Sequence, residues 1–178
     1  MGRYTMDVIL VDERDVQVGT MEKLEVHQKA LLHRAFSIFI FNSKGEMLLQ
    51  QRAANKYHSA GLWTNACCSH PQPGEDTLAA AQLRLEMEMG IVTTIQKAFE
   101  FTYRTSFDNG LTEYEFDHVF VGEYDGQIVP NQDEVSDYCF KSMKDIRESI
   151  QSHPQKYSEW FKIAFPQVEL YRKMQSKS

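Results

Sequence analysis

The tripeptide Asp108-Asn109-Gly110 constrains the fold most, because it separates two long runs rich in aromatic and β-branched residues, Phe99 to Phe107 and Leu111 to Glu123. Asn-Gly is typical of the tight turn that joins two antiparallel strands, since this turn needs positive φ angles. Aromatic and β-branched side chains favour strands. The pattern therefore predicts a long β-hairpin in the second half of the chain.

The first half of the chain contains further extended segments. Ala35 to Phe41 and Met47 to Gln51 are apolar runs joined by turn-forming residues, which predicts a second hairpin. Val8 to Val11 is predicted to form a short strand. Trp63 to His70 is predicted to form another extended segment, which Pro71 ends.

Helical spacing replaces strand alternation after Asp76. Leu78, Ala81 and Leu85 recur on one helix face, with Asp76 at the N-cap position and Gly90 at the C-terminal end. We expect these three apolar side chains to pack inward, against the rest of the protein.

Two more helices follow near the C-terminus. Ser142 to Asp145 has the spacing of a capping box before a short helix, and Ser158 to Met174 is predicted to be a helix disturbed at Pro166. The chain has neither an internal repeat nor a linker. These elements predict one α+β domain over residues 1–178, in which helices flank a mixed β-sheet.

Composition limits the classes of function. The 178 residues carry a formal net charge of −6, which disfavours nucleic-acid binding and requires a local basic patch for any anionic substrate. The longest apolar run, Ala35 to Phe41, is too short to cross a membrane. The three cysteines include the neighbours Cys67 and Cys68, so free thiols in a reducing compartment are expected. We therefore expect a cytoplasmic protein with no nucleic-acid or membrane partner.

A possible reactive surface comes from strand alternation. Glu113 and Glu115 lie two apart in a predicted strand, so both carboxylates project from the same face. Cys68 and His70 have the same relation, whereas Cys67 points the other way. If the two strands neighbour each other, these groups meet on one surface. Paired acids on a strand also occur on ordinary solvated faces, so spacing alone leaves both interpretations open.

Histidines could add metal ligands to this surface. The spacing of His27 and His33 suits neither one helix face nor a zinc finger, so for each alone an isolated surface or core histidine is the favoured interpretation. Together with His70, Glu113 and Glu115, they would form a nitrogen and oxygen ligand set suited to Mn²⁺, Zn²⁺ or Mg²⁺.

Charged residues elsewhere have two interpretations each. Arg84 and Glu88 lie four apart on the predicted helix, either as an exposed ion pair or as an anion-binding arginine beside a Mg²⁺ ligand. Lys23, Arg52 and Lys56 could be solvated or could supply the rest of a basic pocket for an anion. The aromatic side chains Trp63, Tyr103 and Trp160 are expected to pack in the core. Cys139 is expected to be a buried structural thiol.

The sequence resembles the type 1 isopentenyl diphosphate isomerases, a branch of the Nudix-like fold, from about Val8 to Trp160. The segments that carry the resemblance are Trp63-Thr64-Asn65-Ala66-Cys67-Cys68-Ser69-His70-Pro71, His33-Arg34-Ala35-Phe36-Ser37 and Glu113-Tyr114-Glu115. The resemblance implies a Nudix-like core over about residues 33–165. The helix from Asp76 to Gly90 resembles a degenerate Nudix helix, in which Leu83-Arg84 and Met87-Glu88 replace the usual Arg-Glu and double Glu.

The family resemblance implies an enzyme that interconverts isopentenyl and dimethylallyl diphosphate by protonation and deprotonation, through a tertiary carbocation-like state. Glu115, close to Tyr103, is the candidate acid and Cys68 is the candidate base, but the reaction is reversible, so each of the two residues can play both parts. Trp160 could stabilise the positive carbon through its ring face. A thiol in the role of base needs its pKa lowered by its surroundings. The protein is expected to be a monomer or a weak homodimer.

The same resemblance implies cofactors and their ligands. Mn²⁺ or Zn²⁺ is expected at the histidine site, and Mg²⁺ is expected to hold the substrate diphosphate. The implied ligands of the first ion are His27, His33, His70, Glu113 and Glu115. Those of Mg²⁺ are Glu88 and the backbone carbonyl of Cys68, and the implied diphosphate-binding residues are Lys23, Arg52, Lys56 and Arg84.

Two other functions compete with this one. A Nudix hydrolase would cleave a diphosphate with water and would have no use for Cys68. A non-catalytic metal-binding module would use the histidines but would leave Trp160 and the basic residues unexplained.

Overall fold

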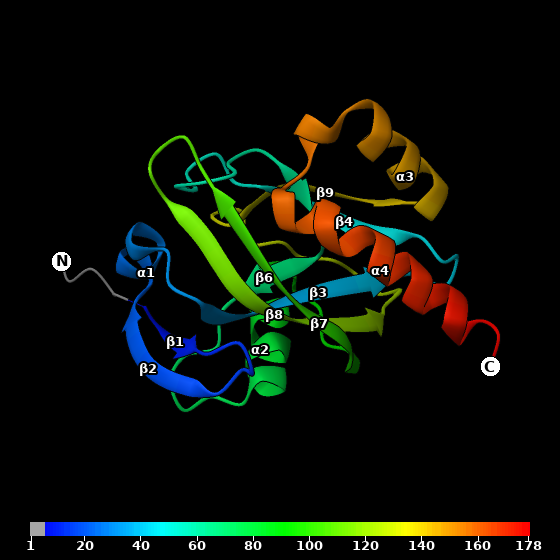
Figure 1. Ribbon diagram of the computed structural model, residues 1–178. Coiled ribbons are helices and arrows are strands. Elements are labelled where there is room, and N and C mark those ends of the chain that lie inside the picture. The colour runs from blue at the N-terminus through cyan, green and yellow to red at the C-terminus, as the bar shows by residue number, and fades with distance from the viewer. Residues whose placement is uncertain (1–5) are drawn as a thin grey trace.

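The computed structural model describes residues 6–178, in which one mixed β-sheet lies between α2 on one side and α3 and α4 on the other (Figure 1). The strands are β1 (Asp7–Val11), β2 (Gln17–Glu22), β3 (His33–Phe41), β4 (Met47–Arg52), β5 (Trp63–Thr64), β6 (Cys67–Ser69), β7 (Ile95–Ser106), β8 (Thr112–Glu123) and β9 (Val135–Lys141). The helices are α1 (Lys23–Lys29), α2 (Thr77–Met89), α3 (Met143–Ser152) and α4 (Glu159–Gln175), with a 3₁₀ turn at Pro154–Lys156. The predicted α+β domain is confirmed. The limits given to its core, about 33–165, stay a prediction.

The central strand β3 brings the predicted reactive segments together. It pairs in parallel with β8 along its whole length, so that His33 lies opposite Glu115. On its other edge it pairs antiparallel with β6, where Ser37 lies opposite Cys68. The two predicted reactive strands are therefore not neighbours, because β3 lies between them. Their side chains nevertheless meet on one face of the sheet.

The long hairpin is confirmed as β7 and β8, which pair antiparallel over most of their length. The second hairpin is confirmed only near its turn, where Phe41 pairs with Met47. Beyond the turn, β4 leaves β3 and pairs with β9 and β5. The extended segment Trp63 to His70 is divided at Asn65 and Ala66 into β5 and β6, which pair with different strands.

Helix α2 begins and ends where the sequence indicates. The Asp76 carboxylate accepts a hydrogen bond from the backbone of Ala79, and Gly90 ends the helix with a φ of +65°. Ala81 and Leu85 are buried as expected. Leu78 is 38% exposed, so its predicted inward packing is wrong. It lies in the first turn of the helix, where Ala80 and Ala81 take the inward positions.

The two C-terminal helices agree with the sequence predictions only in part. The Ser142 side chain caps α3 by accepting from the backbone of Asp145, as the capping box predicts. Helix α4 runs without a break through Pro166, so the expected disturbance does not end it. The elements β2, α1 and β9 are not recognisable from the sequence patterns considered above, although α1 carries Lys23 and His27.

Alternate residues of β3 belong to two hydrophobic clusters, one on each face of the sheet. Phe36, Ile38 and Ile40 pack with the buried side of α2. Phe39 and Phe41 pack on the opposite face with α4, whose Phe161 is fully buried. Burial of each such side chain contributes about 1.5–3 kcal/mol, so both faces of β3 are held firmly. This rigid strand positions the polar groups at its N-terminal end.

Among residues 6–178, no helix has the length and apolar character to cross a membrane. Cys67, Cys68 and Cys139 are all free thiols, as expected. Cys139 is half-buried on β9 and packs against the core, so the predicted burial of this thiol is only partial.

Candidate active site

A cavity of about 220 Å³ lies where α1, β6, α2, β7, β8 and the start of α4 meet. Cys68, His70, Glu113, Glu115 and Trp160 all line it. The walls combine acids, imidazoles, a thiol and basic side chains. The structure therefore gathers residues that the sequence places more than ninety positions apart.

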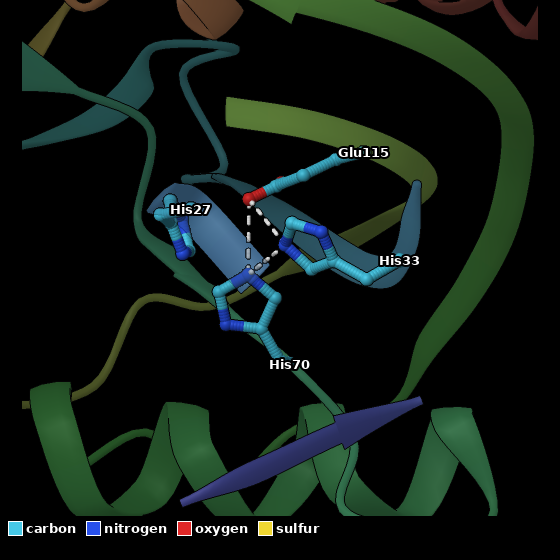
Figure 2. Close-up of side chains that lie close together, drawn as sticks. All are labelled: His27, His33, His70 and Glu115. Carbon is cyan, nitrogen blue, oxygen red and sulfur yellow. Dashed lines mark hydrogen bonds and ion pairs between the residues drawn. The ribbon is translucent and has the colours of Figure 1, made fainter. Parts of the chain in front are cut away.

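His70 and Glu115 of the cavity wall belong to a cluster of buried imidazoles around Glu115 (Figure 2). His70 Nε2 lies 2.9 Å from Glu115 Oε1 and 3.3 Å from His33 Nε2, and His33 Nε2 lies 3.5 Å from the same carboxylate oxygen. Ligands bound about 2.1 Å from one ion are about 3.0–3.4 Å apart, by the geometry of octahedral and tetrahedral sites. These three donors therefore have the spacing that a divalent ion requires.

Backbone contacts fix the histidines for metal binding. His27 Nδ1 contacts the Lys23 carbonyl at 2.7 Å, and His33 Nδ1 contacts the Leu31 carbonyl at 3.0 Å. Each carbonyl accepts a hydrogen bond from the Nδ1–H group of the ring, so Nε2 carries the free lone pair when the ring is neutral. His27 Nε2 is buried, with no hydrogen-bond partner among residues 6–178, and lies within ligand distance of the cluster. A divalent ion would satisfy it.

Burial and neighbouring groups shift the pKa values of the residues in this cluster. Burial lowers the pKa of His70 to about 3 and also lowers the pKa of His27, so both rings are neutral near pH 7. Burial alone would raise the pKa of Glu115, but His70 and His33 hold it well below its ordinary value. Burial opposes protonation of His33 too, yet Glu115 raises the pKa of that ring overall. The cluster therefore holds an ionised carboxylate among imidazoles.

Glu113 lies beside this cluster rather than within it. One of its oxygens lies 3.1 Å from His58 Nε2, and the other accepts from the Tyr103 hydroxyl. Tyr103 also lies 3.0 Å from Glu115 Oε2, so its hydroxyl bridges the two carboxylates. Glu113, His58 and His27 form a second group of possible metal ligands. The sequence placed Glu113 in one set with three histidines and did not single out His58.

Cys68 is surrounded by polar groups on three sides. Trp160 Nε1 donates to its sulfur at 3.1 Å, and the thiol donates to Asn65 Oδ1 at 3.2 Å. Ser37 Oγ lies 3.5 Å from the sulfur and donates to Asp117 at 2.7 Å. Burial, together with the charge of Asp117, raises the pKa of the Cys68 thiol. The expected lowering of this pKa is therefore wrong for the protein alone, because burial outweighs the neighbouring cations.

The strand-parity argument separates the two adjacent cysteines correctly. Cys68 lines the cavity, whereas Cys67 points to the other side and donates to Glu88 Oε2 at 3.2 Å. Glu88 is 5% exposed and accepts from Arg84 at 2.6 Å. This ion pair is therefore not an exposed surface pair. Both residues line the cavity instead.

The predicted basic residues meet at one side of the same cavity. Lys56 is ion-paired with Glu134, and Arg52 donates to the His58 carbonyl at 3.2 Å while its guanidinium lies 5.1 Å from the Trp160 ring. Burial, with a contribution from Lys56, lowers the pKa of Lys23. All four predicted cations line the cavity, namely Lys23, Arg52, Lys56 and Arg84. The local basic patch expected in an acidic protein is present.

Comparison with known proteins identifies relatives over most of the chain. Residues 31–161 match the NUDIX domain model. Isopentenyl-diphosphate Delta-isomerase from Pectobacterium atrosepticum is 48% identical over 165 residues, which cover 93% of this chain and 92% of the relative. Isopentenyl-diphosphate Delta-isomerase 2 from Photorhabdus laumondii is 46% identical over 94% of this chain and 97% of its own length.

Solved structures of lower similarity share the fold. DR0079 from Deinococcus radiodurans superimposes with a TM-score of 0.69 at 18% identity, over 83% of this chain and 90% of that one. A MutT protein from Methanosarcina mazei gives 0.65 at 18% identity, over 81% and 95% of the two chains. These likenesses concern the fold alone. They agree with the sheet and the flanking helices described above.

Proposed function

The chain belongs to the isopentenyl-diphosphate Delta-isomerases, a branch of the Nudix fold, and on that premise we propose that it interconverts isopentenyl and dimethylallyl diphosphate by acid-base chemistry in this cavity. The observation that carries the proposal is the enclosure of a carboxylate-phenol pair, Glu115 with Tyr103, in the same small cavity as the thiol of Cys68. Moving a double bond requires one proton to be added and another to be removed while water is kept out.

The proton transfers are assigned to two groups. In this direction Glu115 starts protonated and Cys68 starts as the thiolate. The Glu115–Tyr103 pair delivers a proton to the terminal alkene carbon, which leaves a positive charge on the tertiary carbon. Cys68 then removes a proton from the carbon next to the one bearing the diphosphate, and the electron pair of that C–H bond becomes the new double bond. In the reverse direction the two groups exchange roles, so the neutral thiol favoured in the protein alone is the form that starts that direction.

Trp160 assists in two ways in this proposal. Its indole N–H donates to the Cys68 sulfur, which favours the thiolate once the proton has left. Its ring lines the cavity and can face a positive carbon. Asn65 holds the sulfur in place, because its amide group donates to the carbonyls of Ile38 and Cys67 and so turns its oxygen toward Cys68.

Divalent metal sites complete the proposal. The donor set of His27, His33, His70 and Glu115, with Glu113 beside it, suits Mn²⁺ or Zn²⁺, and oxygen donors at Glu88 and the Cys68 carbonyl suit Mg²⁺. When bound, the first ion would act as a Lewis acid that polarises Glu115, and Mg²⁺ would neutralise diphosphate charge. Lys23, Arg52, Lys56 and Arg84 hold the diphosphate through charge-assisted hydrogen bonds.

The hydrolase alternative is weaker because of the acids it requires. Of the residues that replace the Nudix acidic cluster on α2, only Arg84 and Glu88 line the cavity, whereas Leu83 and Met87 are more than half exposed. One carboxylate on α2 provides too few ligands for the several metal ions that hydrolysis of a diphosphate uses. We also propose that the enzyme acts in the cytoplasm as a monomer or a weak homodimer.

The test is incubation with isopentenyl diphosphate and Mg²⁺ in deuterated water, followed by NMR. Deuterated dimethylallyl diphosphate is expected from the wild type and from the control Cys139→Ala, whose thiol lies on β9. Cys68→Ala should form none. Free phosphate from the wild type would support hydrolysis instead, and unchanged substrate from the wild type with metal retained would support a binding module.

A further inference from the structure

His58 is a histidine of the cavity that the sequence analysis did not single out and that the proposed mechanism does not use. It lies in the connection between β4 and β5, and its side chain is 7% exposed. Its Nε2 atom lies 3.1 Å from Glu113 Oε2. A buried polar contact of this kind on a proposed metal ligand suggests a role at the metal centre.

The ring of His58 is held firmly on the side away from Glu113. It stacks on Phe107 at a centroid distance of 4.7 Å with planes 11° apart, and its Nδ1 atom lies 3.2 Å from Ser59 Oγ. A hydroxyl that donates to Nδ1 leaves the proton on Nε2, so the neutral ring can donate to Glu113. The ring orientation is therefore fixed by packing and by one hydrogen bond.

His58 completes the contacts of the Glu113 carboxylate. Tyr103 donates to one oxygen, and His58 lies on the other. Each carboxylate oxygen has two lone pairs, so both remain able to bind an ion. A side chain with several rotatable bonds is thereby confined to one orientation, at the edge of the group formed by His27, His33, His70 and Glu115.

A second ion held directly by His27, His58 and Glu113 is the competing interpretation, since these donors also lie within ligand distance of one another. However, His27 has one free lone pair and can serve only one ion. A further dication would also lie beside a reaction that develops positive charge on carbon, and like charges repel strongly in a buried site. The geometry therefore favours a single ion at the histidine site.

We propose that His58 is a positioning residue of the metal centre, which orients the Glu113 carboxylate toward one divalent ion through its Nε2–H. The inference rests on the proposed metal centre and adds to it a residue outside the ligand set. Removal of a group that orients a metal ligand typically weakens metal binding by about 10–100-fold.

Two substitutions separate positioning from packing. His58→Phe keeps a ring that can stack on Phe107 but removes the donor, whereas His58→Gln keeps an N–H donor near the position of Nε2. Mn²⁺ binding to the substrate-free protein would be measured by titration calorimetry, with electron paramagnetic resonance to report the symmetry of the bound ion. His153→Phe, at an exposed histidine, is the matched control.

We expect one Mn²⁺ per chain at the histidine site in every variant. His58→Phe should bind it about 10–100-fold more weakly, with an altered resonance line shape, and His58→Gln should recover most of the loss. Wild-type affinity in His58→Phe would overturn the inference. A fall from two bound Mn²⁺ ions per chain in the wild type to one in His58→Phe would overturn it as well. Failure of the wild type to bind Mn²⁺ would instead contradict the proposed metal centre itself.

Discussion

The cationic end of the cavity is made of long side chains, two of which form partly exposed ion pairs, whereas the histidine end is made of buried side chains fixed by short contacts. The cationic end comprises Lys23, Arg52, Lys56 and Arg84, and the histidine end comprises His27, His33, His70, Glu113, Glu115, Tyr103 and Cys68. Lys56 and Arg84 are each about a quarter exposed, whereas His33 has no exposed side-chain surface.

This difference separates binding from chemistry. Long cations can move to meet a diphosphate, and their partners Glu134 and Glu88 keep them in reach without the substrate. Acid-base groups must be placed within a fraction of an ångström, and strands β3, β6 and β8 provide that rigidity. Substitutions at the two ends should therefore affect different kinetic constants.

The largest effect is expected at Glu115. Glu115→Gln removes a carboxyl that can transfer a proton while keeping the size of the side chain, so kcat should fall by about 10²–10⁴-fold. Deuterium incorporation into product, measured at saturating substrate, reports this directly. Retention of more than about a tenth of the wild-type rate would move the proton transfer to another group.

At the cationic end, Arg84→Gln should act on binding. The loss of one charge-assisted contact to the diphosphate should raise KM by about 10–100-fold, while kcat stays within about threefold of the wild type. Steady-state kinetics with isopentenyl diphosphate separates the two constants. If kcat falls as far as KM rises, Arg84 belongs with the histidine end, and the contrast between the two ends fails.

Acid should destabilise the histidine end in the metal-free protein. The unfolded His70 has its ordinary pKa near 6.5 and the folded one a pKa of about 3, so below pH 6.5 the unfolded state binds a proton that the folded state does not. Stability contributed by this group is present above pH 6.5 and falls at about 1.4 kcal/mol per pH unit below it.

Urea unfolding at pH 6.5 and pH 5.0 in the presence of a chelator tests this. His70→Asn should lose about 1–2 kcal/mol less than the wild type over that interval. The raised pKa of His33 works in the opposite direction, with stability present at low pH, and it is shared by both proteins. Equal losses in the two proteins would show that His70 is not held neutral in the folded state.

The smallest effect is expected at Glu134. Glu134→Gln releases Lys56 from a partly exposed ion pair, which contributes only a few tenths of a kcal/mol, so KM should fall by about two- to threefold. The same kinetic assay measures it. A higher KM would mean that Glu134 holds Lys56 in its binding position, and the cationic end would then be as preorganised as the other.

The sequence predicts local structure well where one residue decides it. Asp76 and Gly90 delimit α2, Asp108-Asn109-Gly110 lies in the turn between β7 and β8, and alternation assigns Cys68 and Cys67 to opposite faces. In each case the cause lies within a few residues. The structure adds no correction to these assignments.

Long-range contacts were less accessible to sequence reasoning. Nothing local to His58 indicates that its ring meets Glu113, and nothing near Asn65 indicates that its amide fixes the thiol of Cys68. Sequence reasoning did not identify Ser37 and Asp117 as part of the site for the same reason, because the pairing of β3 with both β6 and β8 creates their contact. The raised pKa of Cys68 likewise depends on burial, which only the folded structure defines.

The parallel pairing of β3 with β8 has a consequence for synthesis of the protein. It joins His33 to Glu115, segments about eighty residues apart, and contacts of such long sequence separation form late in folding. On the ribosome, His27, His33 and His70 emerge before the strand that supplies both carboxylates. A growing chain therefore exposes imidazoles well before it can enclose an ion between them, and the reactive cavity is assembled only when the last third of the polypeptide has been made.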